Sequence, residues 1–404
     1  MEKNLGLYLH IPFCVSKCAY CDFLSFPISR STPQQDLISA DVVSKYVAAL
    51  IKEIGSCQTK EFESYQIDTI FMGGGTPSIL AGKEIEGIFQ ALQGNFFIAK
   101  DAEISIEVNP GTVTKEKVKV WKDVGINRLS IGLQSVNDDE LKVLGRVHTF
   151  RQFQETYALA REAGFHNINI DLISGIPGQT LDGFLKTLEK VGKCSPEHIS
   201  AYSLIIEEET PFGKRYGERR SQEPSKDKGI LPLPSEDVEW AMYQQTEDVL
   251  SSFGYQRYEI SNYAKEGFIC KHNTGYWERK DYLGVGLGAA SLFEDTRFQN
   301  VSDLEVYLER IKNKQSAREE SDTEVLSLKA QMDEFIFLGL RQIKGVSKAK
   351  FQQCFGEAME AVYQKSMRKL VREGLLIVEG DKVSLTKRGI DISNTVFVEF
   401  LAEE

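Results

Sequence analysis

Along the first half of the chain, short apolar runs alternate with longer stretches in which apolar residues recur every three or four positions. The short runs predict buried strands, and stretches such as 83–92 and 115–124 have the periodicity of helices. Strands that alternate with helices build a parallel sheet with the helices packed outside it. The six predicted strands cover residues 5–12, 67–75, 103–110, 128–135, 167–175 and 198–206.

Six strand–helix units are too few for a complete eight-stranded barrel and predict an open, partial (β/α)6 barrel. Polar residues and glycines gather just after the strands, at the carboxyl ends where such folds place their sites. We therefore expect residues 1–206 to form an α/β domain with its functional site at that rim.

The pattern changes after the sixth strand. Residues 215–237 are rich in charge, Pro and Gly and predict an exposed linker, followed by a helix around 236–253 and a strand over 255–261. Residues 325–404 contain three helical patterns and then two short strands around a Glu-Gly-Asp-Lys turn. We expect 207–324 to be a linker and intermediate segment and the last 80 residues to be a winged-helix-like α+β domain.

Composition narrows the class of protein. The 404 residues are 42% hydrophobic and 26% charged, which excludes disordered, collagenous and coiled-coil chains. The net charge of −11 argues against broad binding to nucleic acids. Residues 328–404 hold 12 Lys/Arg and 11 Asp/Glu, so the winged-helix-like domain lacks a basic footprint and is expected to be structural. A DNA-binding redox regulator is therefore the weakest interpretation.

The chain has no apolar run long enough to span a bilayer, and its start does not resemble a signal peptide. Glu2 lies in that start, and the first apolar run ends at Pro12 without a cleavage site. We expect a cytoplasmic protein, whose thiols stay reduced. Its seven cysteines are an odd number, and three of them lie within residues 14–21, which suits a metal site better than a disulfide framework.

Cys14, Cys18 and Cys21 have C-x3-C-x2-C spacing directly after the first strand. Thiolates are soft ligands that suit iron–sulfur clusters or zinc. A structural zinc site normally has four ligands, and His10 is a candidate for the fourth. A [4Fe–4S] cluster held by three thiolates instead leaves one iron open to a small molecule. The spacing favours the cluster and leaves zinc as the alternative.

The segment CVSKCAYC after a strand resembles the motif of the radical S-adenosylmethionine superfamily. In that superfamily the open iron binds the amino and carboxylate groups of S-adenosylmethionine, and an electron from the cluster releases a 5′-deoxyadenosyl radical. The resemblance implies both cofactors here. Further segments resemble, in matching order, the branch that holds the oxygen-independent coproporphyrinogen III oxidases and the heme chaperones: YLHIPFC, FMGGGTPS, SIEVNP, SIGLQS, NIDLISGIPGQT, YEISNYA and HNTGYW.

The glycine-rich segment 73–77 ends the second strand, where glycines let backbone N–H groups approach a ligand closely. Taken alone it predicts a tight turn, and it is not a Walker A loop. The resemblance matches it to the segment that holds the methionine amino group. It makes Gly74, Gly75 and Thr76 the candidate contacts.

Polar residues also end the third and fourth strands and lie within the fifth. A polar residue at a strand end is usually just solvated, but several on one rim of a parallel barrel indicate a ligand site. The resemblance assigns these positions and an arginine to the ribose and carboxylate of the cofactor, for which bidentate Arg is suited. It adds two tyrosines beside the cluster. The implied contacts are Tyr8, Tyr20, Glu107, Gln134, Arg146 and Asp171.

Three features of the sequence bear on the choice between the oxidases and the chaperones. The oxidases carry a fourth cysteine two positions after the third, where this chain has Phe23, and a long segment before the motif, where only 13 residues precede Cys14. The third feature is His272, in HNTGYW, which matches the H-N-x-x-Y-W motif of the chaperones. Its histidine is implicated in heme binding, and imidazole is a standard ligand of heme iron. Without the resemblance, a histidine beside Tyr276 and Trp277 predicts a packing residue.

Three further features of the sequence do not alter this interpretation. Cys270 is a candidate auxiliary ligand, although an inert thiol is the favoured interpretation. Ala290 stands where relatives commonly have His, which argues against a polar side chain acting there. Residues 284–289 fit G-x-G-x-x-A, but we discard a dinucleotide site because no clear strand precedes them.

The sequence thus predicts a heme chaperone that delivers heme to acceptor apoproteins, among them membrane-associated ones. The alternative is an enzyme, an oxygen-independent coproporphyrinogen III oxidase, in which the radical abstracts hydrogen from a propionate side chain. The resemblance also raises the expectation of a homodimer. We expect no nucleic-acid partner.

Overall fold

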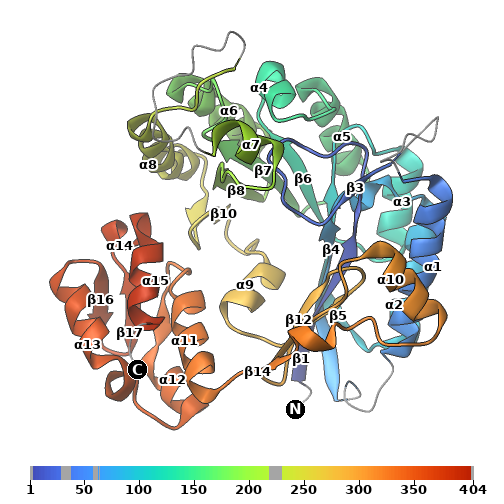
Figure 1. The fold of residues 1–404 in the computed structure, drawn as a ribbon. Coiled ribbons are helices and arrows are strands. Elements are labelled where there is room, and N and C mark those ends of the chain that lie inside the picture. The colour runs from blue at the N-terminus through green and yellow to red at the C-terminus, as the bar shows by residue number, and fades with distance from the viewer. Residues whose placement is uncertain (1–2, 29–37, 58–61, 63, 218–229, 402–404) are drawn as a thin grey trace.

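The computed structural model describes residues 3–28, 38–57, 62, 64–217 and 230–401 (Figure 1). Its centre is a twelve-stranded sheet in the order β14-β13-β12-β11-β1-β4-β5-β6-β7-β8-β10-β9. The run from β11 to β8 is parallel throughout. Six of its strands confirm the predicted partial barrel: β1 (Lys3–Ile11), β4 (Tyr65–Gly74), β5 (Ile98–Val108), β6 (Arg128–Gln134), β7 (Ile168–Ser174) and β8 (His198–Ser203).

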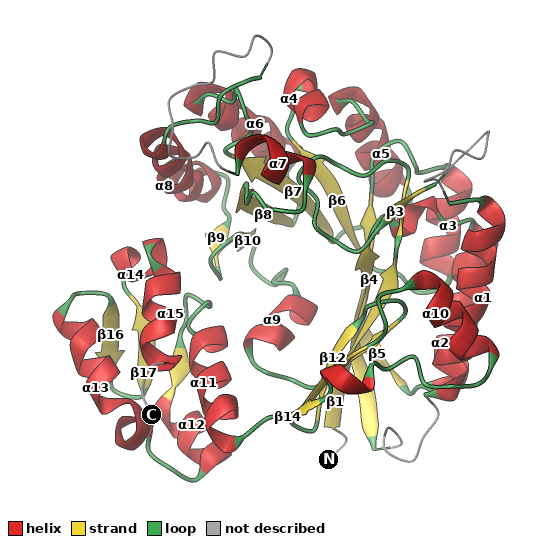
Figure 2. Ribbon diagram, viewed as in Figure 1, coloured by secondary structure: helices red, strands yellow, loops and turns green. Residues whose placement is uncertain are grey.

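Helices cover the outer face of this sheet (Figure 2). Several begin at a Thr whose hydroxyl accepts the backbone N–H three residues on, as Thr114, Thr149 and Thr180 do. The helices of this layer are α1 (Ala40–Ser56), α2 (Gly82–Asn95), α3 (Lys115–Asp123), α4 (Asp138–Val143), α5 (Phe150–Glu162) and α6 (Leu181–Cys194).

Alternation along the strands decides which side chains face the concave side of the sheet. On β1, Leu5, Leu7 and Leu9 are fully buried in the main core beneath the helices. The residues between them therefore face the opposite, concave side, and the register of β1 with β4 places Tyr8 opposite Phe71. The same alternation turns the polar positions of the neighbouring strands toward one shared interior.

The segment after the sixth strand joins the sheet at both ends of the parallel run. One edge gains β10 (Asn262–Ala264), antiparallel to β8, and the other gains β11 (Tyr282–Val285), parallel to β1. The strand predicted over 255–261 is reduced to β9 (Gln256–Arg257). The remaining elements are β12 (Ala290–Phe293), β13 (Thr296–Gln299), β14 (Glu324–Val325), α7 (Pro211–Tyr216), α8 (Glu236–Ser252) and α10 (Leu304–Lys312). Of the predicted linker, residues 218–229 lie outside the described residues.

The C-terminal part has its own hydrophobic core and confirms the winged-helix-like order of three helices followed by a two-stranded wing. Its sheet has the order β15-β17-β16. No helix among the described residues is long and apolar enough to cross a bilayer. The elements are α11 (Leu328–Gly339), β15 (Val346–Ser347), α12 (Lys348–Phe355), α13 (Met359–Arg372), β16 (Leu376–Glu379), β17 (Lys382–Leu385), α14 (Lys387–Asp391) and α15 (Ser393–Leu401).

The short helix α9 (Lys271–Trp277) lies between the sheet and the C-terminal domain (Figure 1). It contacts β4 on one side and α11 on the other. Arg279, just after α9, donates to Glu334 on α11 at 2.9 Å, and the Arg341 guanidinium lies 4.4 Å from the centre of the Trp277 ring. The HNTGYW segment is therefore held by both parts of the molecule.

Candidate functional site

The three clustered cysteines follow β1 at the carboxyl end of the barrel. Cys14 ends β2 (Phe13–Cys14), which pairs with β3 (Phe26–Pro27), and Cys18 and Cys21 follow in the connecting loop as partly exposed free thiols. The hydroxyl of Thr76 donates to Cys14 Sγ at 3.4 Å, and Nη1 of Arg146 donates to Cys18 Sγ at 3.6 Å. Burial raises the pKa of Cys21 to about 11, so this thiol ionises readily only when a metal binds it.

These cysteines fit a cluster better than a zinc ion. His10, the candidate fourth zinc ligand, is engaged at both ring nitrogens: Nδ1 lies 3.0 Å from the Tyr8 hydroxyl and Nε2 lies 2.8 Å from the Leu24 carbonyl oxygen. In a [4Fe–4S] cluster each thiolate binds a different iron, so three separated thiolates are the donor set it needs.

The glycine-rich turn after β4 is packed against its own chain. A Cβ on Gly74, whose φ is +106°, would collide with the His10 ring, and one on Gly75 would collide with the carbonyl oxygen of Phe13. These glycines are therefore required by the close approach of the turn to β1. Their contact with a ligand stays a prediction.

The N–H groups of the same turn are already bonded. Gly75 donates to the Ile11 carbonyl at 2.8 Å and Gly74 donates to the Glu107 carboxylate at 3.1 Å. An ammonium group donates hydrogen bonds and needs acceptors rather than further N–H groups. The acceptor that the structure places against this turn is the carboxylate of Glu107.

Two carboxylates share the concave interior. Burial, together with repulsion from Asp171, raises the pKa of Glu107 to about 8. Burial also raises the pKa of Asp171, although Ser130 and Asn169 donate to its carboxylate at 3.1 and 2.8 Å. A cationic ligand near both groups would favour their charged forms. The sulfonium and ammonium groups of S-adenosylmethionine are such cations.

Arg146 joins the cysteine loop to the strand ends. Its Nη2 donates to the Gly132 carbonyl at 2.6 Å and to Asn109 Oδ1 at 3.2 Å. Its Nε is buried and has no hydrogen-bond partner among the described residues. A buried donor without a partner beside Cys18 is suited to the carboxylate of a ligand.

The remaining predicted contacts lie around this centre. Gln134 ends β6 with φ +71°, in the left-handed region where glycine is favoured, and its side chain is buried. Tyr20 lies within electrostatic range of Arg146, Cys18 and Asp171. The structure therefore brings the predicted rim residues together, with Tyr8 linked to them through His10.

Sequence reasoning missed Asn109 and His148. Asn109 Oδ1 lies 3.1 Å from Nδ1 of His148 and also accepts from Arg146. Burial, with the nearby Arg146 charge, lowers the pKa of His148 to about 3, so the ring stays neutral. Asn109 lies near the carboxyl end of the third predicted strand, and that position was the available signal. No feature of the sequence identified His148 as a site residue.

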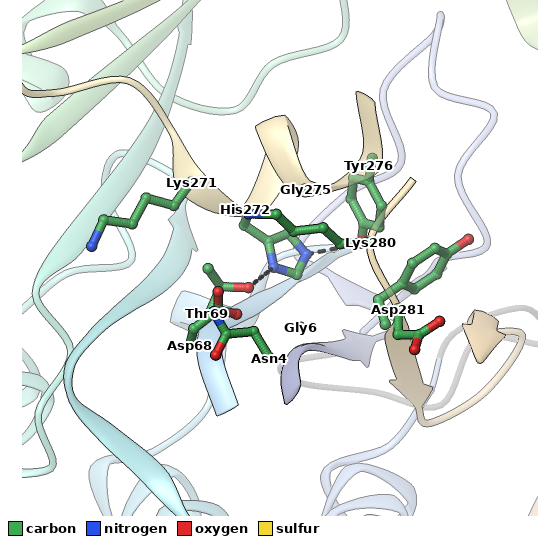
Figure 3. Close-up of a pocket in the computed structure, with 11 residues that line it drawn as sticks. Asn4, Gly6, Asp68, Thr69, Lys271, His272, Gly275, Tyr276, Lys280 and Asp281 are labelled. Atoms are coloured by element: carbon green, nitrogen blue, oxygen red, sulfur yellow. Dashed lines mark hydrogen bonds between the residues drawn. The ribbon is translucent and has the colours of Figure 1, made fainter. Parts of the chain in front are cut away.

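His272 lies on the concave side, toward the opposite end of the barrel interior, and is 3% exposed. Its Nδ1 is 2.9 Å from the Thr69 hydroxyl and its Nε2 is 2.8 Å from the Tyr276 hydroxyl (Figure 3). Burial lowers the pKa of His272 to about 3, so the ring is neutral and one nitrogen carries a lone pair. Phe71 stacks 5.3 Å from the His272 ring and 6.4 Å from the Tyr8 ring, which connects this site to the cofactor rim.

The cavity at His272 has a volume of only about 10 Å³, room for roughly one water molecule. A porphyrin does not fit beside His272 in this arrangement. Cys270, one position before α9, is buried and donates to Glu103 at 3.4 Å, and burial raises its pKa to about 12. These surroundings fit the inert thiol that we favoured.

The discarded dinucleotide signal needs one correction. A strand does lead into residues 284–289, because β11 runs parallel to β1 there. It is followed by the antiparallel strand β12 instead of a helix, so the phosphate-binding geometry is still missing. A Cβ on Gly284 would collide with the carbonyl oxygen of Ala290, so this glycine serves packing. Ala290 itself is exposed on β12.

Two family descriptions match the chain. Residues 8–191 match the radical SAM superfamily, and residues 326–392 match the HemN C-terminal domain. These ranges contain the cysteine loop, most of the partial barrel and most of the winged-helix-like part.

Similar proteins match over nearly the full length. The chain is 35% identical to the heme chaperone HemW of Lactococcus lactis, over 100% of this chain and 99% of that one. It is 34% identical to heme chaperone HemW of Bacillus subtilis, with 98% and 99% covered, and 32% identical to that of Escherichia coli, with 99% and 98% covered. Among solved structures, the Escherichia coli radical SAM enzyme coproporphyrinogen III oxidase (HemN) matches with a TM-score of 0.82 and 25% identity, over 99% of this chain and 90% of that one.

Proposed function

The chain belongs to the heme chaperone HemW family of the radical SAM superfamily, and from this premise we propose that it binds heme and passes it to acceptor proteins. A [4Fe–4S] cluster and S-adenosylmethionine are the cofactors of that superfamily. The observation that carries the proposal is the neutral, buried imidazole of His272, held on the concave face of the same barrel that carries the cysteine loop.

We assign the cluster to Cys14, Cys18 and Cys21. Arg146 holds a positive charge against Cys18, and its buried Nε, without a partner among the described residues, supports a role in binding a carboxylate. When bound, the cluster supplies an electron to the sulfonium of S-adenosylmethionine. The proposed contacts to that cofactor are Tyr8, Tyr20, Gly74, Gly75, Thr76, Glu107, Gln134, Arg146 and Asp171.

The heme ligand in this proposal is His272. Its surroundings support the role, because a neutral imidazole offers a lone pair without first losing a proton. Lys271 and Lys280 line the cavity next to it and are suited to the propionate groups of a porphyrin. The small volume of the cavity requires that part of α9 moves when heme binds.

Anaerobic titration with hemin tests this function through the Soret band of the cluster-reconstituted protein. We expect saturable binding near one heme per chain, lost or strongly weakened in His272→Ala. The matched control is His166→Ala, because His166 is exposed and lies before β7, and it should bind like the wild type. Equal binding by the wild type and His272→Ala would remove His272 from the proposal, and no binding by the wild type would remove the chaperone function.

A second candidate is supported by the similarity to the HemN structure, which is an oxidase. That function would be oxidative decarboxylation of coproporphyrinogen III. Phe23 stands where the oxidases have a fourth cysteine, so we expect no turnover of coproporphyrinogen III with S-adenosylmethionine and a reductant. Sustained turnover would favour the oxidase.

The proposal extends to a cytoplasmic location, to acceptor apoproteins that include membrane-associated ones, and to a homodimer. Transfer is measured by mixing the heme-loaded protein with an apoprotein acceptor and following the acceptor's own Soret band. Sedimentation equilibrium measures the oligomeric state, with and without heme.

A further inference from the structure

The His272 ring is engaged on two sides by hydroxyl groups that belong to different elements. Thr69 belongs to β4, inside the sheet, and is 4% exposed. Tyr276 belongs to α9 itself, one helical turn after His272, and directly follows Gly275. The backbone of His272 is fixed separately, because its N–H donates to Glu103 on β5 at 3.0 Å.

The contacts of Tyr276 leave it as the partner that can move. Its ring packs edge-on against His272 at 4.9 Å and against Tyr282 at 4.7 Å. The cavity beside the imidazole is lined by Thr69 as well as by Tyr276, so the mobility of the two elements decides which partner can give way. Movement of Tyr276 would open Nε2, whereas movement of Thr69 would disrupt the register of β4 with β1.

Each of the two hydroxyls can donate or accept, so the ring has two possible tautomers in this arrangement. If the Tyr276 phenol donates to Nε2, then the ring hydrogen lies on Nδ1 and donates to the Thr69 hydroxyl. Burial raises the pKa of Tyr276, so its hydroxyl stays protonated and is able to donate. The Nδ1–H tautomer directs a lone pair from Nε2, which is the form that a metal ion binds when the other nitrogen keeps a hydrogen-bond partner.

We propose that Tyr276 occupies the iron position on His272 in the heme-free protein: its hydroxyl donates to Nε2 and is displaced by heme iron, while Thr69 keeps the bond to Nδ1–H. The inference rests on the proposed heme-binding function. It names Tyr276 as the residue that gates access to the ligand and Thr69 as the residue that positions it.

Hemin affinity tests the two roles in opposite directions. Tyr276→Phe removes the competing hydrogen bond and is expected to tighten binding by about two- to tenfold, the equivalent of one net hydrogen bond. Tyr157→Phe is the matched control, because Tyr157 lies on the outer helix α5 with its hydroxyl donating to the Cys194 carbonyl, and it should bind like the wild type. Thr69→Val keeps the branched shape of the side chain but removes the hydroxyl, and it is expected to weaken hemin binding several-fold. Thr69→Ser keeps the hydroxyl and should bind hemin like the wild type.

A measurement on the heme-free protein tests the tautomer directly. The protein has five histidines, so ¹⁵N-histidine labelling with His272→Ala as the assignment control identifies the His272 ring. We expect the hydrogen on Nδ1. A hydrogen on Nε2 would refute the gating role of Tyr276. The same conclusion would follow if Tyr276→Phe bound hemin no more tightly than the wild type.

The failure of this inference is distinguishable from that of the function. If hemin binding depends on His272 but Tyr276→Phe does not change the affinity, the heme-binding function is supported and the gating role of Tyr276 is refuted. If hemin binds equally well without His272, the gating role falls and heme binding stands, and if the wild type does not bind hemin, both fall. Tighter binding by Tyr276→Phe together with weaker binding by Thr69→Val supports both roles.

Discussion

The backbone N–H of His272 donates to the carboxylate of Glu103 at 3.0 Å, although the two residues lie 169 positions apart in the chain. The N–H of Lys271 donates to the other carboxylate oxygen, also at 3.0 Å. The residue that precedes α9, Cys270, offers no side-chain cap of its own. Glu103 therefore caps α9 from the sheet, and its negative charge lies at the positive end of the helix.

Glu103→Gln should loosen α9, because an amide offers one oxygen where the carboxylate offers two. We expect the free energy of unfolding to fall by about 1–2 kcal/mol, the usual cost of a lost helix cap. Backbone hydrogen exchange of residues 271–277 should become faster, and hemin affinity should fall. Glu86→Gln, at an exposed position of α2, is the control. Unchanged exchange over 271–277 would contradict the capping role.

Each of Cys14→Ala, Cys18→Ala and Cys21→Ala should abolish cluster assembly, because the loop then has two thiolates left. Iron and sulfide content and the visible absorbance after anaerobic reconstitution measure the effect. Cys354 is exposed in the C-terminal domain, so Cys354→Ala should assemble the cluster like the wild type. A full cluster in any of the three loop variants would contradict the assignment.

Stability should depend on pH through Glu107. Its pKa is about 8 in the folded protein and near 4.3 in an unfolded chain, so between these values the folded state holds more protons. The free energy of unfolding therefore decreases as pH rises through this window. Glu107→Gln removes this contribution, so its Tm relative to the wild type should rise from pH 5 to pH 9. A difference in Tm that stays constant with pH would contradict the raised pKa.

The same carboxylate should couple cofactor binding to pH. A cationic ligand favours the ionised form of Glu107, so S-adenosylmethionine should bind more tightly as pH rises from about 5 to 8. Isothermal titration at several pH values measures this dependence. Binding by Glu107→Gln should be weaker and should lose that dependence.

Arg146→Gln should weaken binding of S-adenosylmethionine by at least tenfold, because a charge-assisted hydrogen bond is worth about 1.5–3 kcal/mol. The variant also loses the charge beside Cys18, so iron content is measured in parallel. Arg151→Gln is the control, since Arg151 is exposed on α5. Normal affinity in an iron-replete Arg146→Gln protein would contradict the carboxylate assignment.

Local patterns predicted the parts of the molecule that local interactions decide. The six barrel strands, the helices and the wing follow from hydrophobic periodicity. The strand predicted over 255–261 failed because the Glu259 carboxylate accepts the backbone N–H of Ser261 and the side-chain amide of Asn262, which turns the chain. The pairing of β11 with β1 was missed because no spacing pattern encodes which distant strands meet.

The site was predictable to a similar degree. The cysteine spacing and the HNTGYW segment are contiguous and can be recognised in the sequence. The contacts that Glu103 and Thr69 make with α9 join residues far apart in the chain, so no motif contains them. Gly74 and Gly75 were predicted to approach a ligand, and in the structure they lie close to their own chain. The sequence does not distinguish approach to a ligand from the approach to β1 that the structure has.

The pairing of Gly6 on β1 with Tyr282 on β11 constrains how the molecule is built during translation. A nascent chain can pair β1 with β4 soon after Gly74 leaves the ribosome, but the other edge of β1 stays open until Val285 has been made. That open edge lies directly before the cysteine loop and is a template for pairing with other chains. Premature termination before β11 would therefore leave an aggregation-prone strand joined to three unprotected thiols.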